Sequence, residues 1–460
     1  VFLILDDVGV VSSAAYDDIY ASERYAPTPN FNRLCEDGVR FENVWVYPTC
    51  SPTRAAMLTG KYGFRTGVTQ PCFMGLAEIG PDETTFMRLI KAQKPEYSLS
   101  SYGKWHLGSS EQLQGAFAPN FMGWDHFSGG LEFGLEDYYN WDNTIDGVTT
   151  TATTYATSKN VDDAIAFLNE DGRVQSPFVV WFGFFAPQTL HLPPDDLHSY
   201  TQRTGEPDDI AAHQIDYFEA AQEATDNAFQ RFKDYLEAEG QLDNTIFIFM
   251  GDNGTENNDI NGIRLHPRPY DGLPGKFSLA ETGLRVPLCV AGTPLERTPH
   301  SSQRLVHAVD LYATVLDLVG VTDDGTTDAL SFVEELMVAD SDDSTALPRE
   351  ILMAEQFFAL EADPLGGLEH GLVIRDGRYK FKVTQNRPEL TYSPSCFDVV
   401  NDFVEENDLF VACPSPDAGP ECADALSACA ELEQRLNSLV CPAVDPRNPW
   451  GDYCDAMGEP

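Results

Sequence analysis

The sequence predicts an α/β protein with a mostly parallel central sheet flanked by helices, followed by a smaller α+β domain. Through about the first 320 residues, short apolar runs alternate with segments of helical period. This alternation is typical of parallel strands, because each needs a crossover to return to the same edge of the sheet. The 460 residues also exceed the roughly 250–300 that one core usually serves. We therefore expect domains over 1–340 and 345–460.

Short runs without charged residues predict the buried strands, because a strand covered on both faces has no polar side to show. Segments with apolar residues at helical spacing predict the crossover helices. The expected strands are Val1–Leu5, Tyr97–Tyr102, Phe178–Phe185 and Thr245–Met250. The expected helices are Asp162–Asn169, Asp209–Ala238 and Ser302–Leu318.

The composition turns polar and acidic at Val338–Ser344, which predicts a linker. Short strand-like segments and one long helix follow, as expected of a small α+β domain. The strands are Ile351–Ala354, Gly371–Ile374 and Tyr379–Val383, and the helix is Ala423–Leu439.

The chain carries a net charge of −44, from 73 acidic and 29 basic residues. This excludes a nucleic-acid partner, because phosphate contacts need a basic surface, and it disfavours anionic membranes. An anionic substrate would be repelled at long range and must therefore bind in a local positive pocket. The most apolar run, Phe178–Ala186, is shorter than the roughly 20 residues that span a bilayer, so no membrane span is expected.

Ten cysteines are present, and six of them fall in the last 65 residues. None forms a C-x-x-C pair, which argues against a zinc ribbon. We expect disulfides near the C-terminus and therefore an oxidising compartment. If Cys50 is set aside for chemistry, nine remain, and at least one of these must be unpaired within the chain.

Polar groups follow four of the expected strands. Ligands of open α/β sheets bind beyond the carboxyl ends of the strands, so these groups are candidate site residues. They are Asp6-Asp7, Gly103-Lys104-Trp105-His106, Ala186-Pro187-Gln188-Thr189-Leu190-His191 and Gly251-Asp252-Asn253-Gly254.

Two of these groups are acidic and predict a metal site. Asp6, Asp7 and Asp252 offer carboxylate oxygens, and Asn253 adds a carbonyl oxygen. Such hard ligands suit Ca²⁺ or Mg²⁺ better than zinc or copper. A turn or helix N-cap is the alternative for Asp6-Asp7 taken alone, and the second acidic pair favours metal.

Cys50 is expected at the start of a helix. Ser51 suits the N-cap, Pro52 the first helical position, and Gly60 the end. Backbone N–H groups there favour an anion, and Arg54 lies one turn along to help hold it. A buried structural cysteine and a low-pKa thiolate nucleophile are the alternatives.

Three motifs in order resemble the sulfatase family. Cys50-Ser51-Pro52-Thr53-Arg54 with Leu58-Thr59-Gly60 matches its signature C-x-P-x-R-x-x-x-L-T-G. Gly103-Lys104-Trp105-His106-Leu107-Gly108 matches the second signature. Gly275-Lys276 with Glu281-Thr282-Gly283-Leu284-Arg285-Val286-Pro287 resembles the third, with Thr282 in place of a glycine. The resemblance implies an alkaline-phosphatase-like fold for the first domain.

The resemblance also implies a modified nucleophile. A formylglycine-generating enzyme would oxidise Cys50 to formylglycine (3-oxoalanine), whose hydrated aldehyde carries two hydroxyls. One would attack sulfur with help from the metal, and the other would later expel sulfate. Asp6, Asp7, Asp252, Asn253 and the modified Cys50 would then bind Ca²⁺, with Mg²⁺ as the less favoured ion.

The remaining implied roles concern positioning and proton transfer. Arg54 and Lys104 would hold the formylglycine, and Asp252 would take the proton of the attacking hydroxyl. His106 would take the proton of the second hydroxyl. Lys276 would bind sulfate, as Lys104 also does, and assist the leaving oxygen.

One segment departs from the family pattern. Family members often read A-P-H-T-P-x-H after the third strand, whereas this chain has Gln188 in place of the first histidine and one residue fewer. Either His191 takes over the contact to sulfate and the leaving group, or Gln188 binds sulfate as a neutral donor. We favour His191, with a loop residue near the entrance as the alternative.

The substrate expected from the sequence is a sulfated carbohydrate, with a small aryl sulfate as the second choice. Aromatic segments at Gly123–Gly130 and Asp137–Trp141 offer either a wall for sugar rings or a packed insertion. Phosphate or phosphonate ester hydrolysis on the same fold is the rival reaction. A non-catalytic sulfated-glycan binder is the rival class, if Cys50 stays a thiol. A secreted or periplasmic location is expected.

Overall fold

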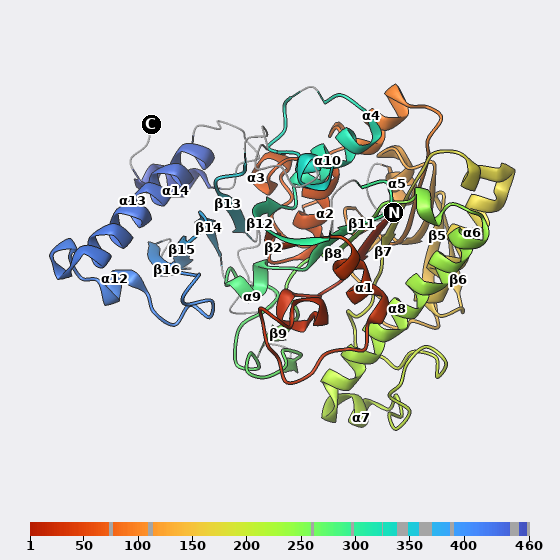
Figure 1. The fold of residues 1–460 in the computed structure, drawn as a ribbon, viewed down its shortest axis with the longest axis horizontal. Helices are drawn as coiled ribbons and strands as arrows, with labels where there is room; N and C mark the ends of the chain where they lie inside the picture. The colour runs from red at the N-terminus through yellow and green to blue at the C-terminus, as the bar shows by residue number, and fades with distance from the viewer. Residues whose placement is uncertain are drawn as a thin grey trace.

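A ten-stranded sheet formed by the described residues is the centre of the computed structural model (Figure 1). The structure describes all residues except 73–76, 109–113, 259–261, 296–298, 324, 338–347, 358–369, 387–390, 442–449 and 458–460. The strand order is β12 (His300–His307), β2 (Val39–Trp45), β11 (Leu288–Ala291), β8 (Phe247–Gly251), β1 (Phe2–Leu5), β7 (Phe178–Gly183), β3 (Ser98–Lys104), β4 (His126–Gly130), β5 (Trp141–Ile145) and β6 (Val148–Ala152).

The middle of this sheet is parallel, as the sequence predicts. β1 pairs in parallel with β7 and β8, and β3 pairs in parallel with β7 and β4. β11 runs antiparallel between β8 and β2, and β5 and β6 form an antiparallel hairpin at the far edge. The carboxyl ends of β1, β3, β7 and β8 therefore meet at one edge.

Helices cover both faces of the sheet, and β1 shows why its sequence is apolar throughout. Phe2 and Ile4 belong to the hydrophobic core on one face, and Leu3 and Leu5 to the core on the other. α2 (Cys50–Thr59), α4 (Phe86–Gln93) and α10 (Asp310–Val319) pack on the first face. α1 (Pro29–Asp37), α6 (Ala156–Asn169) and α8 (Gln214–Ala238) pack on the second.

Two of the helix predictions need correction. The segment expected as one helix over Asp209–Ala238 is broken at His213, which separates α7 (Pro207–Ala212) from α8. The helix expected over Ser302–Leu318 is wrong in its first part, because His300–His307 is strand β12 and only α10 is helical. β12 pairs in parallel with β2, which is far away in sequence, and this pairing overrides the local pattern.

The described residues after 347 form a smaller sheet with a long helix beside it, here named the C-terminal subdomain. Its four antiparallel strands are β13 (Leu352–Gln356), β14 (Gly371–Arg375), β15 (Tyr379–Asn386) and β16 (Thr391–Asp398), and the helix is α13 (Pro420–Val440). In Figure 1 they lie beyond β2 and β12. The core on one face of the large sheet continues into this sheet. The expected linker lies outside the described residues, so the boundary at 340–345 stays a prediction.

Shorter elements complete the described chain. The short helices are α3 (Gly63–Thr66), α5 (Ala118–Phe121), α9 (Glu281–Leu284), α11 (Val333–Met337), α12 (Leu409–Ala412) and α14 (Gly451–Met457). The 3₁₀ segments are Val10–Ser12, Ala14–Tyr16, Gly115–Phe117, Glu170–Gln175, Leu242–Asn244 and Pro416–Ala418. A small ladder joins β9 (Asn257–Asn258) and β10 (Ile263–Arg264).

Four disulfides join eight of the cysteines, and the predicted cluster near the C-terminus is confirmed. Cys50 and Cys72 remain as buried free thiols. None of the helices in the described part of the chain is long and apolar enough to cross a membrane. The pairs are Cys35–Cys289, Cys396–Cys429, Cys413–Cys422 and Cys441–Cys454.

Candidate active site

Polar side chains from several strand ends meet at one edge of the central sheet. Leu5 of β1 lies opposite Gly251 of β8 in a parallel pair, so the acidic pairs that follow the two strands are neighbours. The backbone N–H of Asp7 donates to Oδ1 of Asp252 at 3.2 Å. Lys104 is the last residue of β3 and reaches the same place. The fold therefore assembles the groups that the sequence places after its strands.

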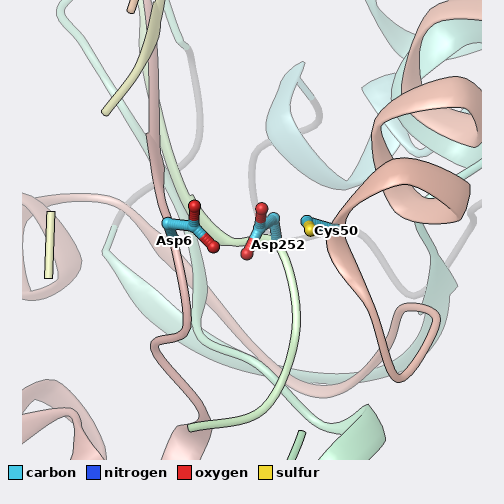
Figure 2. A group of neighbouring side chains, drawn as sticks. All are labelled: Asp6, Cys50 and Asp252. Carbon is cyan, nitrogen blue, oxygen red and sulfur yellow. The ribbon is translucent and has the colours of Figure 1, made fainter. Parts of the chain in front are cut away.

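Cys50 is the first residue of α2 and faces this acidic cluster (Figure 2). Its Sγ atom lies 3.1 Å from Nδ1 of His106 and 3.5 Å from Nζ of Lys104. The helix begins two residues earlier than the sequence predicts, so Thr49 and not Ser51 is the N-cap residue. Ser51 lies inside the first turn, where its Oγ atom accepts a hydrogen bond from a backbone N–H.

Asp6, Asp252 and Cys50 lie side by side and could hold a divalent cation (Figure 2). One donor atom from each lies within 4.8 Å of the others, and all three residues are buried. Among the described residues, Oδ1 of Asp6, Oδ2 of Asp7 and Oδ1 of Asn253 are buried without a hydrogen-bond partner. Unpartnered buried oxygens are costly, and Ca²⁺ and Mg²⁺ bind carboxylate and amide oxygens. The donor set therefore fits such an ion.

Each carboxylate of the cluster also has a cationic partner, and all the side chains involved are buried. Buried ion pairs need good geometry to offset the cost of removing both charges from water. On a chain of net charge −44, these cations supply the local positive charge that an anionic substrate requires. The pairs are Lys104 with Asp6 at 2.5 Å, Lys276 with Asp7 at 2.6 Å, and Arg54 with Asp252 at 2.8 Å.

The crowded carboxylates differ in their pKa values. Burial, reinforced by the nearby Asp252, raises the pKa of Asp6 well above its usual range. Burial alone would raise the pKa of Asp7 too, but Lys276 and Lys104 lower it. Repulsion among neighbouring carboxylates is relieved when a cation binds between them. The electrostatics of the cluster thus agree with its unpartnered oxygens.

His106 presents an unprotonated nitrogen to Cys50. Its Nε2 atom lies 2.9 Å from the carbonyl oxygen of Cys72, which can only accept a hydrogen bond. Nε2 therefore carries the proton, and Nδ1 of the neutral ring faces Sγ. Burial, together with Lys104, lowers the pKa of His106 well below its usual range, so the ring is neutral at neutral pH. His106 is placed to accept a proton from a group at residue 50.

The structure brings Gln188 into the cluster, and it places His191 behind it. Oε1 of the buried Gln188 accepts a hydrogen bond from Nζ of Lys104 at 2.9 Å. The described contacts of His191 include a hydrogen bond with the Tyr155 hydroxyl at 2.9 Å and a stack on Tyr138 with ring centroids 3.5 Å apart. Tyr138 in turn donates to the carbonyl oxygen of Gln188 at 2.6 Å. Burial lowers the pKa of His191 to about 4.

Phe133 is a site residue that sequence reasoning missed. Its ring centroid lies 5.2 Å from Nζ of Lys104 and 5.3 Å from Nζ of Lys276. It also meets His106 edge-on at 5.2 Å, while 41% of the residue remains exposed. The available signal was its place just after β4, at the same edge of the sheet, between the two aromatic segments singled out above.

A cavity of about 420 Å³ opens beside the site. Gly134, whose backbone approaches Oε1 of Gln188, is part of its lining. So are Asp137 and Trp141 of the predicted aromatic wall. A larger cavity of about 530 Å³ lies at the opposite ends of β1 and β7, away from the cluster, and we assign it no role in the chemistry.

Comparison with known proteins gives one family. The sulfatase family model matches residues 1–321. "Uncharacterized sulfatase YdeN" of Escherichia coli is 27% identical over 333 residues, which cover 64% of this chain and 54% of that protein. An "N-acetylglucosamine-6-O-sulfatase" of Bacteroides thetaiotaomicron is 31% identical over 194 residues, covering 42% and 31%. The chain thus spans about half or less of the length of these curated relatives.

The fold also has solved relatives. One is the structure of BT4656 in complex with its substrate D-glucosamine-2-N,6-O-disulfate. It superposes with a TM-score of 0.70 at 20% identity, over 98% of this chain and 99% of that one. At this identity the likeness establishes the fold alone.

Proposed function

Because this chain belongs to the sulfatase family, we propose that it hydrolyses sulfate esters with a nucleophile derived from Cys50. The position of Cys50 carries the proposal. Its Sγ atom stands where an oxygen of formylglycine would stand, between Nδ1 of His106 and Nζ of Lys104. Oxygens of Asp6 and Asp252 lie beside it. A base, a cation and metal-binding oxygens around one residue are what a hydrated aldehyde needs to attack sulfur.

Two groups would complete the site. Hydrated formylglycine supplies two hydroxyls on one carbon, one for the attack on sulfur and one for the later release of sulfate. A bound Ca²⁺ supplies positive charge to the attacking hydroxyl and to sulfate oxygens. Asp6, Asp7, Asp252 and Asn253 would hold the ion together with residue 50. We favour Ca²⁺ over Mg²⁺, because Mg²⁺ usually keeps several waters rather than so many protein oxygens.

Two residues near residue 50 would accept protons during the reaction. Asp252 would accept the proton of the attacking hydroxyl, and Arg54 holds its carboxylate in place through two N–H groups. A third N–H of Arg54 donates to the carbonyl oxygen of Lys104 and ties the helix start to β3. His106 would accept the proton of the second hydroxyl through its free Nδ1 atom.

Three side chains would bind the sulfate group. The ammonium groups of Lys104 and Lys276 stabilise charge on its oxygens, and Lys276 donates a proton to the leaving oxygen. Gln188 accepts from Lys104 through Oε1, which leaves its amide N–H₂ group as the neutral donor to sulfate. His191 holds the Gln188 segment through Tyr138 rather than touching sulfate, which revises the preference drawn from the sequence.

We infer a sulfated carbohydrate as the substrate. One relative is named for action on N-acetylglucosamine 6-O-sulfate, and one structural relative was solved with a disulfated glucosamine. Phe133 offers an exposed ring beside both lysines on which a sugar face can stack. A small aryl sulfate fits the same ring and is the second candidate.

Maturation is part of the proposal. Cys50 has no exposed surface in the folded chain, so a formylglycine-generating enzyme must reach it before folding is complete. The disulfides support a secreted or periplasmic protein, because such bonds persist in oxidising compartments.

Peptide mass spectrometry of the Cys50 peptide tests the nucleophile. In protein from its native host, the expected result is an aldehyde in place of the thiol. An intact thiol would overturn the enzyme and favour a sulfated-glycan binder. Matched aryl sulfate, phosphate and phosphonate esters test the reaction class, and turnover must be highest on the sulfate.

A further inference from the structure

The backbone that follows Lys276 is held by side chains of the C-terminal subdomain. We name residues 275–281 the Lys276 loop. Three buried groups from three separate segments reach across to it. Nε2 of Gln356, at the end of β13, donates to the carbonyl oxygen of Phe277 at 2.8 Å; Nζ of Lys380, on β15, donates to the carbonyl oxygen of Leu279 at 2.7 Å; and Oε1 of Glu405 accepts from the N–H of Glu281 at 2.7 Å.

An ion-pair network ties these groups together. The Glu281 carboxylate, which is fully buried, pairs with Arg285 at 2.5 Å, Arg375 at 3.3 Å and Lys380 at 3.5 Å. Lys380 also pairs with Glu405 at 2.7 Å. Arg375 and Lys380 belong to the small sheet, whereas Arg285 precedes a strand of the large one. Removing one member would leave other charges buried and unpaired, which is strongly destabilising. The network therefore holds the small sheet firmly against the Lys276 loop.

The loop itself has a backbone that needs support. Phe277 has a φ of 71°, a strained conformation that is rare for a residue with a side chain. Its N–H donates to the carbonyl oxygen of Pro48 at 2.9 Å, and the N–H of Lys276 donates to that of Thr255 at 3.0 Å. The large domain therefore holds the loop by the N–H groups of Lys276 and Phe277. The C-terminal subdomain holds it by two carbonyl oxygens and by the N–H of Glu281.

We propose that the C-terminal subdomain positions Lys276 for the reaction, with Gln356, Lys380 and Glu405 as positioning residues. The inference rests on the proposed contact of Lys276 with sulfate. Because Gln356 binds the residue next to Lys276, loss of its hydrogen bond lets the ammonium group move. Displacing a reacting group by about 1 Å can slow a reaction about 100-fold.

Two variants test the proposal in full-length, formylglycine-containing enzyme. Gln356→Met keeps the side-chain length and removes the donor to Phe277. Glu405→Leu removes the acceptor for Glu281, whereas Glu405→Gln keeps an oxygen there. We expect Gln356→Met and Glu405→Leu to lower kcat about tenfold or more and to raise KM, and Glu405→Gln to restore most of the loss. Amides 277–281 should exchange with deuterium faster in the two damaged variants.

Arg349→Met is the matched control. Arg349 forms a buried ion pair with Asp310 that makes no contact with the Lys276 loop. It should lower the melting temperature and leave kcat/KM and the exchange of 277–281 unchanged.

Three outcomes decide the matter. Unchanged kcat and loop exchange in Gln356→Met and Glu405→Leu overturn the proposal. So does an equal loss of kcat and loop protection in Arg349→Met. If the wild-type protein cleaves no sulfate ester, the proposed function fails. Faster exchange confined to 277–281 in Gln356→Met and Glu405→Leu would still show that the C-terminal subdomain holds the Lys276 loop.

Discussion

Nδ1 of His106 lies 3.1 Å from Sγ of Cys50, and its Nε2 atom is fixed by the carbonyl oxygen of Cys72. The bond to that carbonyl decides the tautomer, so the ring shows residue 50 a lone pair and not a proton. His106 also has a φ of 52°, an uncommon backbone for a histidine. Two separate constraints therefore aim one base at one atom.

His106→Ala should separate the two halves of the reaction. The first hydroxyl can still attack through Asp252, but no base remains to free the sulfate. We expect one equivalent of leaving alcohol in a burst and then steady-state turnover at least about 100-fold slower than wild type. Rapid-quench kinetics measures both phases. His213→Ala, at an exposed histidine, should behave as wild type, and a steady rate for His106→Ala near wild type would contradict the assignment.

Removal of divalent cations should lower both activity and thermal stability. Ca²⁺ at 100 times its Kd should stabilise the folded protein by about 2.7 kcal/mol. Mg²⁺ at the same concentration should stabilise it less, because we expect it to bind more weakly. Calorimetry of chelator-treated protein, with each ion added back, measures the difference. Asp6→Asn should shrink the shift, whereas Asp234→Asn, on the exposed side of α8, should keep it. An equal response of both variants would place the ion elsewhere.

The segment after β7 contains two candidate sulfate ligands, Gln188 and His191, and variants can distinguish them. Gln188→Ala should lower kcat/KM about ten- to hundredfold, because a hydrogen bond to a charged group contributes about 1.5–3 kcal/mol. His191→Phe keeps the stack on Tyr138 and should lower kcat/KM less than threefold. Steady-state kinetics on aryl and sugar sulfates compares them. A larger loss for His191→Phe, greatest on sugars with poor leaving groups, would return the role of acid to His191.

Phe133→Ala should raise KM about three- to tenfold for substrates that stack on the ring, since aromatic stacking contributes about 0.5–1.5 kcal/mol. kcat should change less, because the ring lies beside the lysines and not at residue 50. Phe133→Tyr should keep the wild-type KM. Phe121→Ala removes an equally exposed ring that lies against Arg88 instead, and it serves as the control. If Phe121→Ala raises KM as much as Phe133→Ala does, substrates do not stack on the Phe133 ring.

Glu355 should make stability depend on pH. Burial raises its pKa from 4.5 to about 7, although Trp450 and the N–H of Phe64 donate to it. The folded state therefore binds this proton more tightly than the unfolded chain. The contribution of the protonated Glu355 to the free energy of unfolding is complete below about pH 4.5 and is lost as the pH rises through 7.

Urea unfolding at pH 5 and pH 8 measures this effect. Wild type should lose about 2.5 kcal/mol relative to Glu355→Gln between the two pH values. Glu355→Gln is less stable overall, because its amide cannot accept from both donors. Parallel pH curves for the two proteins would show that Glu355 does not titrate in this range.

The elements that sequence patterns predicted are those whose burial is decided locally. β1, β7 and β8 are covered on both faces, and their residues are apolar throughout. The β5–β6 hairpin was missed although Asp146-Gly147 is a strong turn signal. β12 was misread because its pairing with β2 lies outside any local window.

The sequence by itself determined the chemistry available to this protein: Cys50 at a helix start, four oxygen donors after two strands, and Lys104, His106 and Lys276 in family order. Tertiary structure alone decided which of Gln188 and His191 meets Lys104, because loop geometry sets which side chain points inward. It alone placed Phe133 over the lysines and the C-terminal subdomain on the Lys276 loop. Those contacts join segments far apart in the chain, and such distances are set only when the whole core packs.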